Sequence, residues 1–246
     1  FDMDGVVTRT ASVHAQAWRQ MFDEFLQHRA ERLGEPYRPF EYPCEYLAHV
    51  DGRPRFQGVE AFLRSRGIEL PAGTPRDLPG FATIGALGNL KNAFFQRIVA
   101  EEGVARFETT IGLIHALRAR GVHVGLATSS RNAREILERT GTAALFQTVV
   151  DGVVSEQLGL RGKPEPDIFL TACARLGVPP ARAIVVEDAA SGVQAGARGR
   201  FALVVGVARE HNARELRENG ADWVVADLAE TNPEELSRLV RARRIP

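Results

Sequence analysis

Phe1-Asp2-Met3-Asp4-Gly5-Val6-Val7-Thr8 is the stretch that opens the chain, and it holds two carboxylates two residues apart. If this stretch ends a strand, both carboxylates point to the same side, because side chains at positions i and i+2 share one face. Gly5 follows directly and lets the chain turn sharply beside a ligand. Two like charges held together favour a cation between them, and carboxylate oxygens suit Mg²⁺. A solvated acidic turn is the alternative interpretation.

Length and composition are typical of a globular protein with one large domain or two unequal ones. The chain has 246 residues and a formal net charge of zero, so bulk charge favours neither a nucleic-acid partner nor a membrane partner. No apolar run is long enough to span a bilayer, and no signal peptide precedes the first motif. Cys44 and Cys173 form no paired motif, which indicates a reduced, cytoplasmic setting. We also expect apolar residues to precede Phe1, since the chain begins inside the expected strand.

Two secondary-structure patterns divide the chain. Up to about residue 103 the sequence shows helical periodicity and loops, with expected helices over 11–30, 58–66 and 82–102. Beyond that point helical patterns alternate with short apolar runs, which predict strands over 122–127, 148–150, 183–186, 201–205 and 223–225. This alternation is typical of a parallel sheet covered by helices. The prediction is a Rossmann-like α/β core over residues 1–10 and 105–246, with an all-helical domain inserted over residues 11–104.

Four polar groups are expected at the carboxyl edge of that sheet, where ligands bind in such folds. Besides the opening acids they are Thr128-Ser129-Ser130-Arg131-Asn132, Gly162-Lys163-Pro164-Glu165-Pro166 and Glu187-Asp188. Together they offer carboxylates for a metal, a hydroxyl and a helix N-terminus for phosphate oxygens, and a lysine for phosphate charge. This is the equipment of phosphoryl transfer. Singly, each has an ordinary alternative: Thr128 or Ser129 as a helix cap, Lys163 as a surface lysine, the acid pair as a solvated strand end.

The four motifs in this order resemble those of the haloacid dehalogenase superfamily. The matching patterns are Asp-x-Asp-Gly-Val, Thr-Ser-Ser, Gly-Lys-Pro-x-Pro-Asp and Val-Glu-Asp, and the resemblance covers nearly the whole chain. It implies that Asp2 is a nucleophile that forms an aspartyl-phosphate and that Asp4 is the general acid/base. A carboxylate nucleophile agrees with the physical logic, because it divides one difficult transfer into two easier ones.

The same resemblance implies how phosphate and metal are held. The transferring phosphate would be bound by Thr128, Ser129 and Lys163. The implied cofactor is Mg²⁺, which would offset the charge of both reacting partners. Its expected ligands are Asp2, the backbone carbonyl of Asp4, Asp188, and Glu187 directly or through water.

The inserted helices resemble the cap of the β-phosphoglucomutase-like subgroup. The similar motifs are Thr10-x-x-x-His14-x-x-x-Trp18, Asp51-Gly52-Arg53-Pro54-Arg55, Lys91-Asn92 and, on the core, Ser130-Arg131-Asn132. The substrate-binding residues that the resemblance implies are Thr10, His14, Gly52, Arg55, Lys91, Ser130, Arg131 and Asn132. As alternatives, His14 and Trp18 pack inside the cap, and Arg55 is a plain surface arginine. The other histidines show no metal-ligand spacing; they are His28, His49, His115, His123 and His211.

The function implied by the resemblance is a Mg²⁺-dependent mutase that interconverts β-D-glucose 1-phosphate and glucose 6-phosphate. We expect a cytoplasmic monomer that acts on a small phosphorylated sugar. One alternative is a phosphatase for a small sugar or polyol phosphate, and another is a non-catalytic sugar-phosphate sensor or an accessory domain of a longer polypeptide. Segments 36–46 and 70–79 look longer than in minimal mutases and are candidates for reshaping the sugar pocket. Phe107-Glu108-Thr109-Thr110 also replaces the Pro-Gly often found where the cap chain returns to the core.

Overall fold

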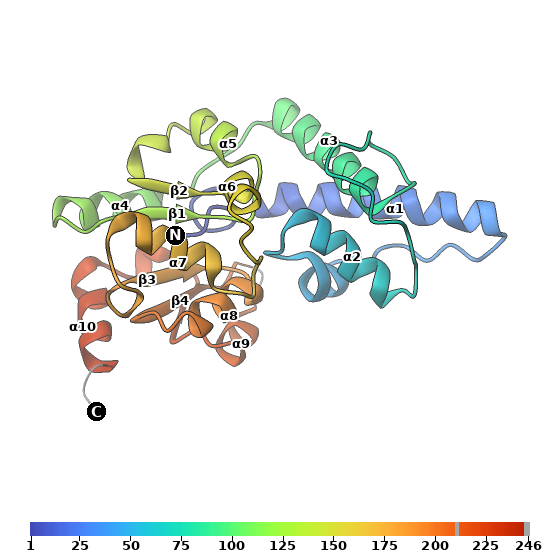
Figure 1. The fold of residues 1–246 in the computed structure, drawn as a ribbon. Coiled ribbons are helices and arrows are strands. Elements are labelled where there is room, and N and C mark those ends of the chain that lie inside the picture. Colours follow the sequence, from blue (N-terminus) through green and yellow to red (C-terminus); the bar gives the residue numbers. More distant parts are fainter. Residues whose placement is uncertain (210–211, 244–246) are drawn as a thin grey trace. The chain divides into compact units, whose positions relative to one another are not determined.

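The computed structural model describes residues 1–209 and 212–243, which fall into two compact units (Figure 1). The core unit consists of residues 1–9 and 104–246, and the helical unit of residues 10–103. The division expected from the sequence lies at residues 10 and 104. His211 and the last residues of the expected core, 244–246, lie outside the described residues.

Short parallel strands form the centre of the core unit. β1 (Gly125–Ala127) pairs with β2 (Thr148–Val150), and β3 (Ile184–Glu187), β4 (Leu203–Val207) and β5 (Trp223–Val225) pair in that order. Every residue of β4 is buried, as expected for a strand covered on both faces. The predicted α/β fold is therefore confirmed. The apolar run over 122–127, however, yields a strand only in its last three residues.

The helices of the core unit pack along these strands. α7 packs on β1 and β2, α8 on β3 and β4, and α9 on β4 and β5. Their bounds, with those of the other helices of this unit, are α4 (Glu108–Ala119), α5 (Ala133–Arg139), α6 (Gly152–Gln157), α7 (Asp167–Leu176), α8 (Ala190–Arg198), α9 (Ala213–Glu218) and α10 (Pro233–Arg243). The short α6 was not predicted, because its six residues are too few for a periodic pattern. Asp151 begins it by accepting hydrogen bonds from the backbone of Val153 and Val154.

The opening segment connects the two groups of strands. The backbone nitrogen of Phe1 donates to Gly125 and that of Ala127 donates to Phe1, both at 2.9 Å, while the nitrogen of Asp2 donates to Val186 at 3.0 Å. Phe1 and Asp2 thus lie in extended form between β1 and β3. The expectation that Asp4 also ends this strand is wrong, because the chain already turns at Met3.

The turn after Asp2 is held by one carbonyl group. The Met3 oxygen accepts from the backbone nitrogens of Val6, Val7 and Thr8, the last two at 2.9 Å. The Thr8 hydroxyl donates to the same oxygen at 3.2 Å. Asp4 therefore sits on a tight loop. Gly5 indicated a turn, but Val6, Val7 and Thr8 are β-branched residues that favour strands, so the residue at which extension stops was not predictable.

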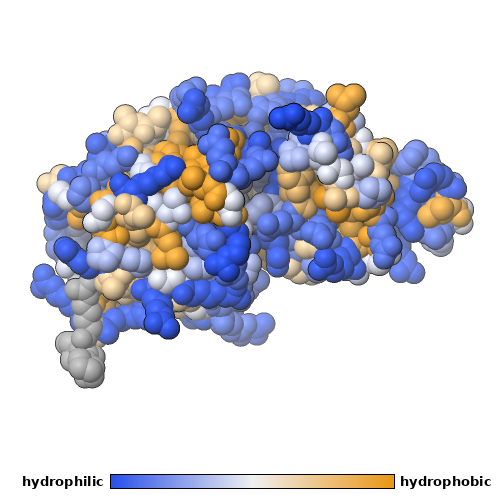
Figure 2. All heavy atoms as spheres, viewed as in Figure 1, coloured by the Kyte–Doolittle hydropathy of each residue, from blue (hydrophilic) through white to orange (hydrophobic). Residues whose placement is uncertain are grey.

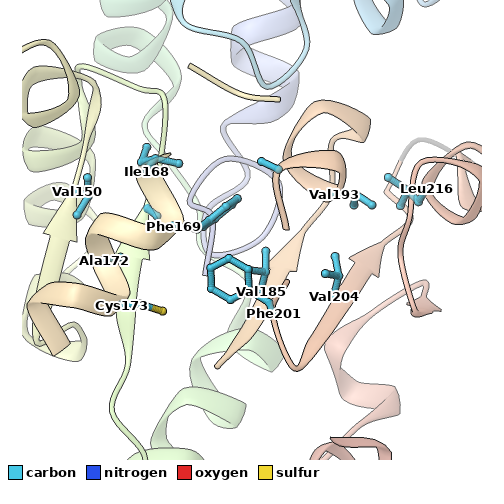
Figure 3. Close-up of a cluster of buried hydrophobic side chains, with 12 residues drawn as sticks. Val150, Ile168, Phe169, Ala172, Cys173, Val185, Val193, Phe201, Val204 and Leu216 are labelled. Carbon is cyan, nitrogen blue, oxygen red and sulfur yellow. The ribbon is translucent and has the colours of Figure 1, made fainter. Parts of the chain in front are cut away.

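A hydrophobic cluster fixes the elements that carry the polar strand ends (Figure 3). α7 contributes Ile168, Phe169, Ala172 and Cys173 to this cluster, and the strands contribute Val150 of β2, Val185 of β3 and Val204 of β4. The rings of Phe169 and Phe201 meet edge to face, with centroids 6.0 Å apart. Packing of this kind holds the start of α7 and the end of β3 in fixed positions.

The helical unit contains α1 (Ala11–Leu33), a π-helical turn (Tyr46–Val50), α2 (Arg55–Ser65) and α3 (Ile84–Glu102). α1 packs against α3, and the ring of Phe22 in α1 stacks on Phe40 and lies tilted against Phe62. All residues of this unit are described, and none of them is in a strand, as the sequence predicted. The π-helical turn was not predicted.

The surface is mostly polar. Hydrophilic side chains cover most of the face shown in Figure 2, with apolar side chains in scattered groups. Among the described residues, no helix combines the length and the apolar character that crossing a membrane requires.

Candidate active site

A buried lysine joins two buried carboxylates at the carboxyl edge of the sheet. Asp2 lies beside β3, Glu187 is the last residue of β3, and Lys163 lies just before α7. The Lys163 ammonium donates to Asp2 Oδ1 at 2.7 Å and to Glu187 Oε1. Asp2 is 5% exposed, Glu187 0% and Lys163 2%. The alternative interpretations, a surface lysine at position 163 and a solvated strand end at Glu187, are therefore wrong. The group carries two carboxylates and one ammonium.

The charges of this group depend on one another. Burial alone would lower the pKa of Lys163, but Asp2 and Glu187 raise it above its ordinary value, so the ammonium stays protonated. Burial raises the pKa of Asp2 to about 8; Lys163 opposes this rise, and Glu187 and Asp4 add to it. A single ammonium therefore does not compensate the buried carboxylates. A further cation would favour the ionised form of Asp2.

Three carboxylates form a group that such a cation fits. Oxygens of Asp2, Glu187 and Asp188 all lie within 4.8 Å of one another. The other oxygen of Glu187 accepts from the backbone nitrogens of Asp188 and Ala189, both at 2.9 Å, which orients its carboxylate. Asn212 donates to the Asp188 carbonyl at 3.1 Å, a contact that the sequence did not predict. A set of carboxylate oxygens is the donor chemistry that Mg²⁺ prefers.

Two glycines leave room for these carboxylates. A Cβ atom at Gly5 would lie 1.7 Å from Asp188 Oδ2, and one at Gly192 would lie 1.8 Å from Glu187 Oε1. Gly5 also has a φ of +77°, which glycine adopts without strain. The sequence predicted a close approach at Gly5 but not at Gly192, which reads as one of several small residues in a helix.

The loop after β1 brings a hydroxyl to Asp4. The Thr128 hydroxyl lies 3.5 Å from Asp4 Oδ2, and it accepts from the backbone nitrogen of Ser130 at 3.1 Å. The Ser130 hydroxyl accepts in turn from the nitrogen of Asn132 at 3.2 Å. These contacts organise the loop itself, and the N-terminus of α5 has no side-chain cap, so the helix-cap alternative for Thr128 is wrong.

Two further polar residues of this loop, Ser129 and Arg131, lie next to α6. Ser129 packs so close to α6 that a Cβ at Gly152 would lie 2.5 Å from its carbonyl oxygen. The Arg131 guanidinium forms an ion pair with Glu156 of α6, and its side chain is 31% exposed. Arg131 thus pairs with a partly exposed glutamate of α6.

The loop after Asp4 is held by donors from distant parts of the core unit. The Gly5 carbonyl accepts from Arg209 Nε at 3.0 Å, and the Val6 carbonyl accepts from Thr110 Oγ1 at 2.7 Å. The Val7 carbonyl accepts from the backbone nitrogen of Phe107 at 2.9 Å, and the Thr8 carbonyl accepts from that of Gly5, within the loop itself, at 2.8 Å. No acceptor of this loop is therefore left without a protein donor. Such complete pairing fixes the backbone that follows the acid motif.

Arg209, which lies just after β4, makes further contacts beyond its hydrogen bond to this loop. Its guanidinium lies 3.8 Å from the ring centre of Phe107 and pairs with Asp227 at 2.7 Å. Arg9 lies over the same ring at 4.4 Å. Phe107 is the residue that stands in place of the expected Pro-Gly, so the aromatic ring at this position has a packing role of its own.

In the helical unit, a second buried lysine contacts a histidine. Lys91 is 3% exposed, and its ammonium contacts His14 Nδ1 and lies 5.1 Å and 5.0 Å from the ring centres of Trp18 and Phe95. The His14 ring stacks on Phe95 with centroids 4.2 Å apart. His14 and Trp18 therefore do pack inside this unit, as the alternative interpretation had it.

The other expected substrate residues of this unit lie at the starts of α1 and α2. Thr10 is buried, and its carbonyl accepts from the nitrogen of His14 at 2.8 Å. Gly52 turns the chain with a φ of +68°. Arg55 donates to Asn89 Oδ1 at 3.3 Å and stacks on Phe56 at 5.1 Å, so it is not a plain surface arginine.

Comparison with known proteins agrees with this arrangement. The family model described as haloacid dehalogenase-like hydrolase matches residues 1–200. The chain belongs to this family. A β-phosphoglucomutase from Mycobacterium bovis is 46% identical over 233 residues, which cover 94% of this chain and 89% of that protein. One from Bacillus subtilis is 33% identical over 208 residues, covering 84% and 81%.

Solved structures of the family share the fold. The crystal structure of a β-phosphoglucomutase from Clostridium difficile matches with a TM-score of 0.75, covering 100% of this chain and 97% of the other at 22% identity. The predicted membership is thus confirmed, and the chain is a β-phosphoglucomutase-like enzyme of the haloacid dehalogenase-like family.

Proposed function

We propose that this enzyme is a β-phosphoglucomutase that interconverts β-D-glucose 1-phosphate and glucose 6-phosphate through an aspartyl-phosphate at Asp2. The observation that carries the proposal is the buried group of Asp2, Lys163 and Glu187, with Asp4 and Thr128 next to it. The similarity to mycobacterial β-phosphoglucomutase over most of the chain supports the substrate.

Each candidate active-site residue of the core unit has its own proposed role. A carboxylate oxygen of Asp2 attacks phosphorus, and the bond from phosphorus to the sugar oxygen breaks. Asp4 gives a proton to that leaving oxygen, and takes one from the attacking hydroxyl in the second half of the reaction. Thr128, Ser129 and Lys163 bind the phosphate oxygens, where an ammonium and a hydroxyl stabilise the charge of the transition state.

Enzymes of this family generally depend on Mg²⁺. Here Asp2, Glu187 and Asp188, with the backbone carbonyl of Asp4, would hold the ion. A bound Mg²⁺ supplies charge that offsets both the nucleophile and the phosphate. The fit rests on three convergent carboxylates whose combined charge Lys163 only partly neutralises.

We further propose that the helical unit is the cap and that its polar residues bind the substrate. Arg55 and Arg131 would grip the phosphate that does not react, because a guanidinium matches phosphate oxygens in a bidentate manner. Ser130 and Asn132 would contribute hydrogen bonds to the same phosphate. Thr10, His14, Gly52 and Lys91 would line the sugar side of the site.

Turnover of β-D-glucose 1-phosphate with Mg²⁺ and a catalytic amount of glucose 1,6-bisphosphate tests the proposal. Formation of glucose 6-phosphate is the expected result, and Asp2→Asn should abolish it while leaving the circular dichroism spectrum unchanged. Release of inorganic phosphate without glucose 6-phosphate would replace the mutase with a sugar phosphatase. An Asp2→Asn variant with wild-type turnover would exclude Asp2 as the nucleophile.

A further inference from the structure

The start of α3 carries two glycines where helices usually avoid them. Each glycine inside a helix costs about 1 kcal/mol relative to alanine. A Cβ atom at Gly85 would lie 2.2 Å from the carbonyl oxygen of Thr74, and one at Gly88 would lie 2.6 Å from the ring of Phe56. The glycines therefore allow two segments to press directly on α3: the loop over residues 70–80 and the start of α2.

Backbone hydrogen bonds join that loop to the first turn of α3. The nitrogens of Ile84 and Gly85 donate to the carbonyls of Pro71 and Ala72, both at 3.0 Å. The first nitrogens of a helix have no partner within the helix, so here the loop provides their acceptors. The loop therefore caps the N-terminus of α3.

Asp77 fixes the shape of the same loop. Its two carboxylate oxygens accept from the hydroxyls of Thr74 at 2.7 Å and Thr83 at 2.5 Å. Thr83 also caps α3 by accepting from the nitrogen of Ala86 at 2.9 Å. One carboxylate thus ties the middle of the loop to the residue that begins the helix.

Asn89, one turn further along α3, links this loop to Arg55. Its amide nitrogen donates to the carbonyls of Asp77 at 2.7 Å and Pro75 at 3.1 Å, and its amide oxygen accepts from Arg55 Nη2 at 3.3 Å. The opposite orientation of the amide would direct its oxygen at two carbonyl groups, so the contacts fix which atom faces Arg55. Every polar atom of this side chain is in use.

We propose that Asn89 is a positioning residue for Arg55, and that the loop over residues 70–80 acts through Asn89 to set where the second phosphate of the substrate is bound. The inference rests on the proposed function, in which Arg55 grips the phosphate that does not react. An amide suits this task better than a carboxylate, because it orients the guanidinium without neutralising the charge that the phosphate needs.

The test compares two substrates, β-D-glucose 1-phosphate and acetyl phosphate, in wild type and in Asn89→Ala. β-D-Glucose 1-phosphate carries a group that must reach Arg55 in each cycle, whereas acetyl phosphate phosphorylates Asp2 with no second phosphate to bind. We expect the KM for β-D-glucose 1-phosphate to rise about tenfold, the size of effect that losing one hydrogen bond to a charged group produces. Hydrolysis of acetyl phosphate should stay within about twofold of wild type. Arg97→Ala is a matched control, since it removes one exposed hydrogen bond, to Gln20, from the same helix.

A double variant separates positioning from a general loosening of the unit. If Asn89 acts through Arg55, adding Asn89→Ala to Arg55→Ala should not change the KM for β-D-glucose 1-phosphate any further. Asp77→Ala alone should raise this KM, as Asn89→Ala does. Three results would overturn the inference. They are an equal loss of activity with β-D-glucose 1-phosphate and acetyl phosphate, an effect of Asn89→Ala that persists in the Arg55→Ala background, and an unchanged KM for β-D-glucose 1-phosphate.

The outcome is distinguishable from failure of the proposed function. Inorganic phosphate as the sole product would overturn the mutase. The Kd of glucose 1,6-bisphosphate, whose second phosphate can still reach Arg55, would then decide the positioning role, and a Kd raised about tenfold by Asn89→Ala would support it. If neither substrate is turned over, the Kd of glucose 6-phosphate, measured by calorimetry, takes the place of the KM. A Kd that Asn89→Ala leaves unchanged would overturn the inference.

Discussion

A Cβ atom on Gly5 would lie 1.7 Å from the Asp188 carboxylate, so the backbone after Asp4 passes directly against one of the three acids of the candidate metal group. Substituting Gly5 by alanine must move either the loop or the acid. We expect Gly5→Ala to reduce kcat by about a hundredfold, because small displacements of reacting groups have effects of that size.

Gly159→Ala is the control for this prediction. Gly159 also has a positive φ, +64°, but no atom lies within 4 Å of its Cβ position. It therefore reproduces the backbone strain of the first variant without the collision, and its cost is about 1–2 kcal/mol of stability. Similar kcat losses in the two variants would mean that strain, and not the contact with Asp188, limits position 5.

The two acids of the opening motif are expected to differ in their dependence on metal. The Asp4 carboxylate faces Thr128 and lies outside the group of oxygens that Asp2, Glu187 and Asp188 form. Asp4→Asn should therefore lower kcat by about a hundred- to ten-thousandfold and leave the Mg²⁺ affinity near that of wild type. Asp188→Ala should lower both. Calorimetric titration of Mg²⁺ decides the question, and equal losses of affinity would contradict the separate roles.

Removal of divalent metal should make stability depend on pH. Burial raises the pKa of Asp2 to about 8, whereas in the unfolded chain it is near its ordinary value of 3.8. The folded state then holds a proton that the unfolded state lacks, so the stability of the chelated protein should fall as pH rises from about 4 to 8 and level off above. Thermal unfolding in chelator measures this slope, and Asp2→Asn, which cannot titrate there, should remove it. A slope that persists in Asp2→Asn would assign it to another group.

Much of the core site was predictable because its residues follow strands. Parallel strands end at a common edge, so acids and a hydroxyl after successive apolar runs had to meet there. Asp4 was misplaced because the hydrogen bonds that stop the extension all go to a backbone carbonyl, that of Met3, which any residue could supply. Gly85 and Gly88 read only as weak helix formers, since close approach depends on the loop and the ring that happen to face them.

The segment over residues 36–46 is held to the helical unit by a paired arginine. Arg66 donates to both carboxylate oxygens of Glu45, at 2.5 Å and 2.7 Å, and to the carbonyl of Pro39 at 2.8 Å. Burial raises the pKa of Glu45, but the Arg66 hydrogen bonds, a hydrogen bond from the backbone nitrogen of Glu41 and the charge of Arg66 together outweigh it, and the net pKa is lowered. A lowered pKa means that the stabilisation is present above the ordinary value and is lost as pH falls through the folded value.

Glu45→Gln should therefore destabilise the protein by about 1–2 kcal/mol at neutral pH and by less in acid. Glu60→Gln is its control, because Glu60 pairs with Arg64 in a single, largely exposed contact and should change stability by less than about 0.5 kcal/mol. Chemical denaturation at pH 7 and near pH 4 provides the comparison. A Glu45→Gln effect that does not shrink in acid would show that the pair contributes through packing alone.

Arg209 offers the last test, because it reaches the loop after the acid motif from the end of β4. It donates to the Gly5 carbonyl at 3.0 Å, pairs with Asp227 and covers the Phe107 ring. Arg209→Gln should free the Gly5 carbonyl and let the loop that carries Asp4 move, so we expect kcat to fall about tenfold and the KM to change much less. Arg209→Lys keeps the charge beside Asp227 but loses the planar group that stacks, and should recover activity only in part. Arg198→Gln is the control, since Arg198 forms an exposed ion pair with Glu165 in the same unit. If Arg209→Gln lowers the melting temperature while kcat stays at the wild-type value, the arginine supports the fold and does not position the loop.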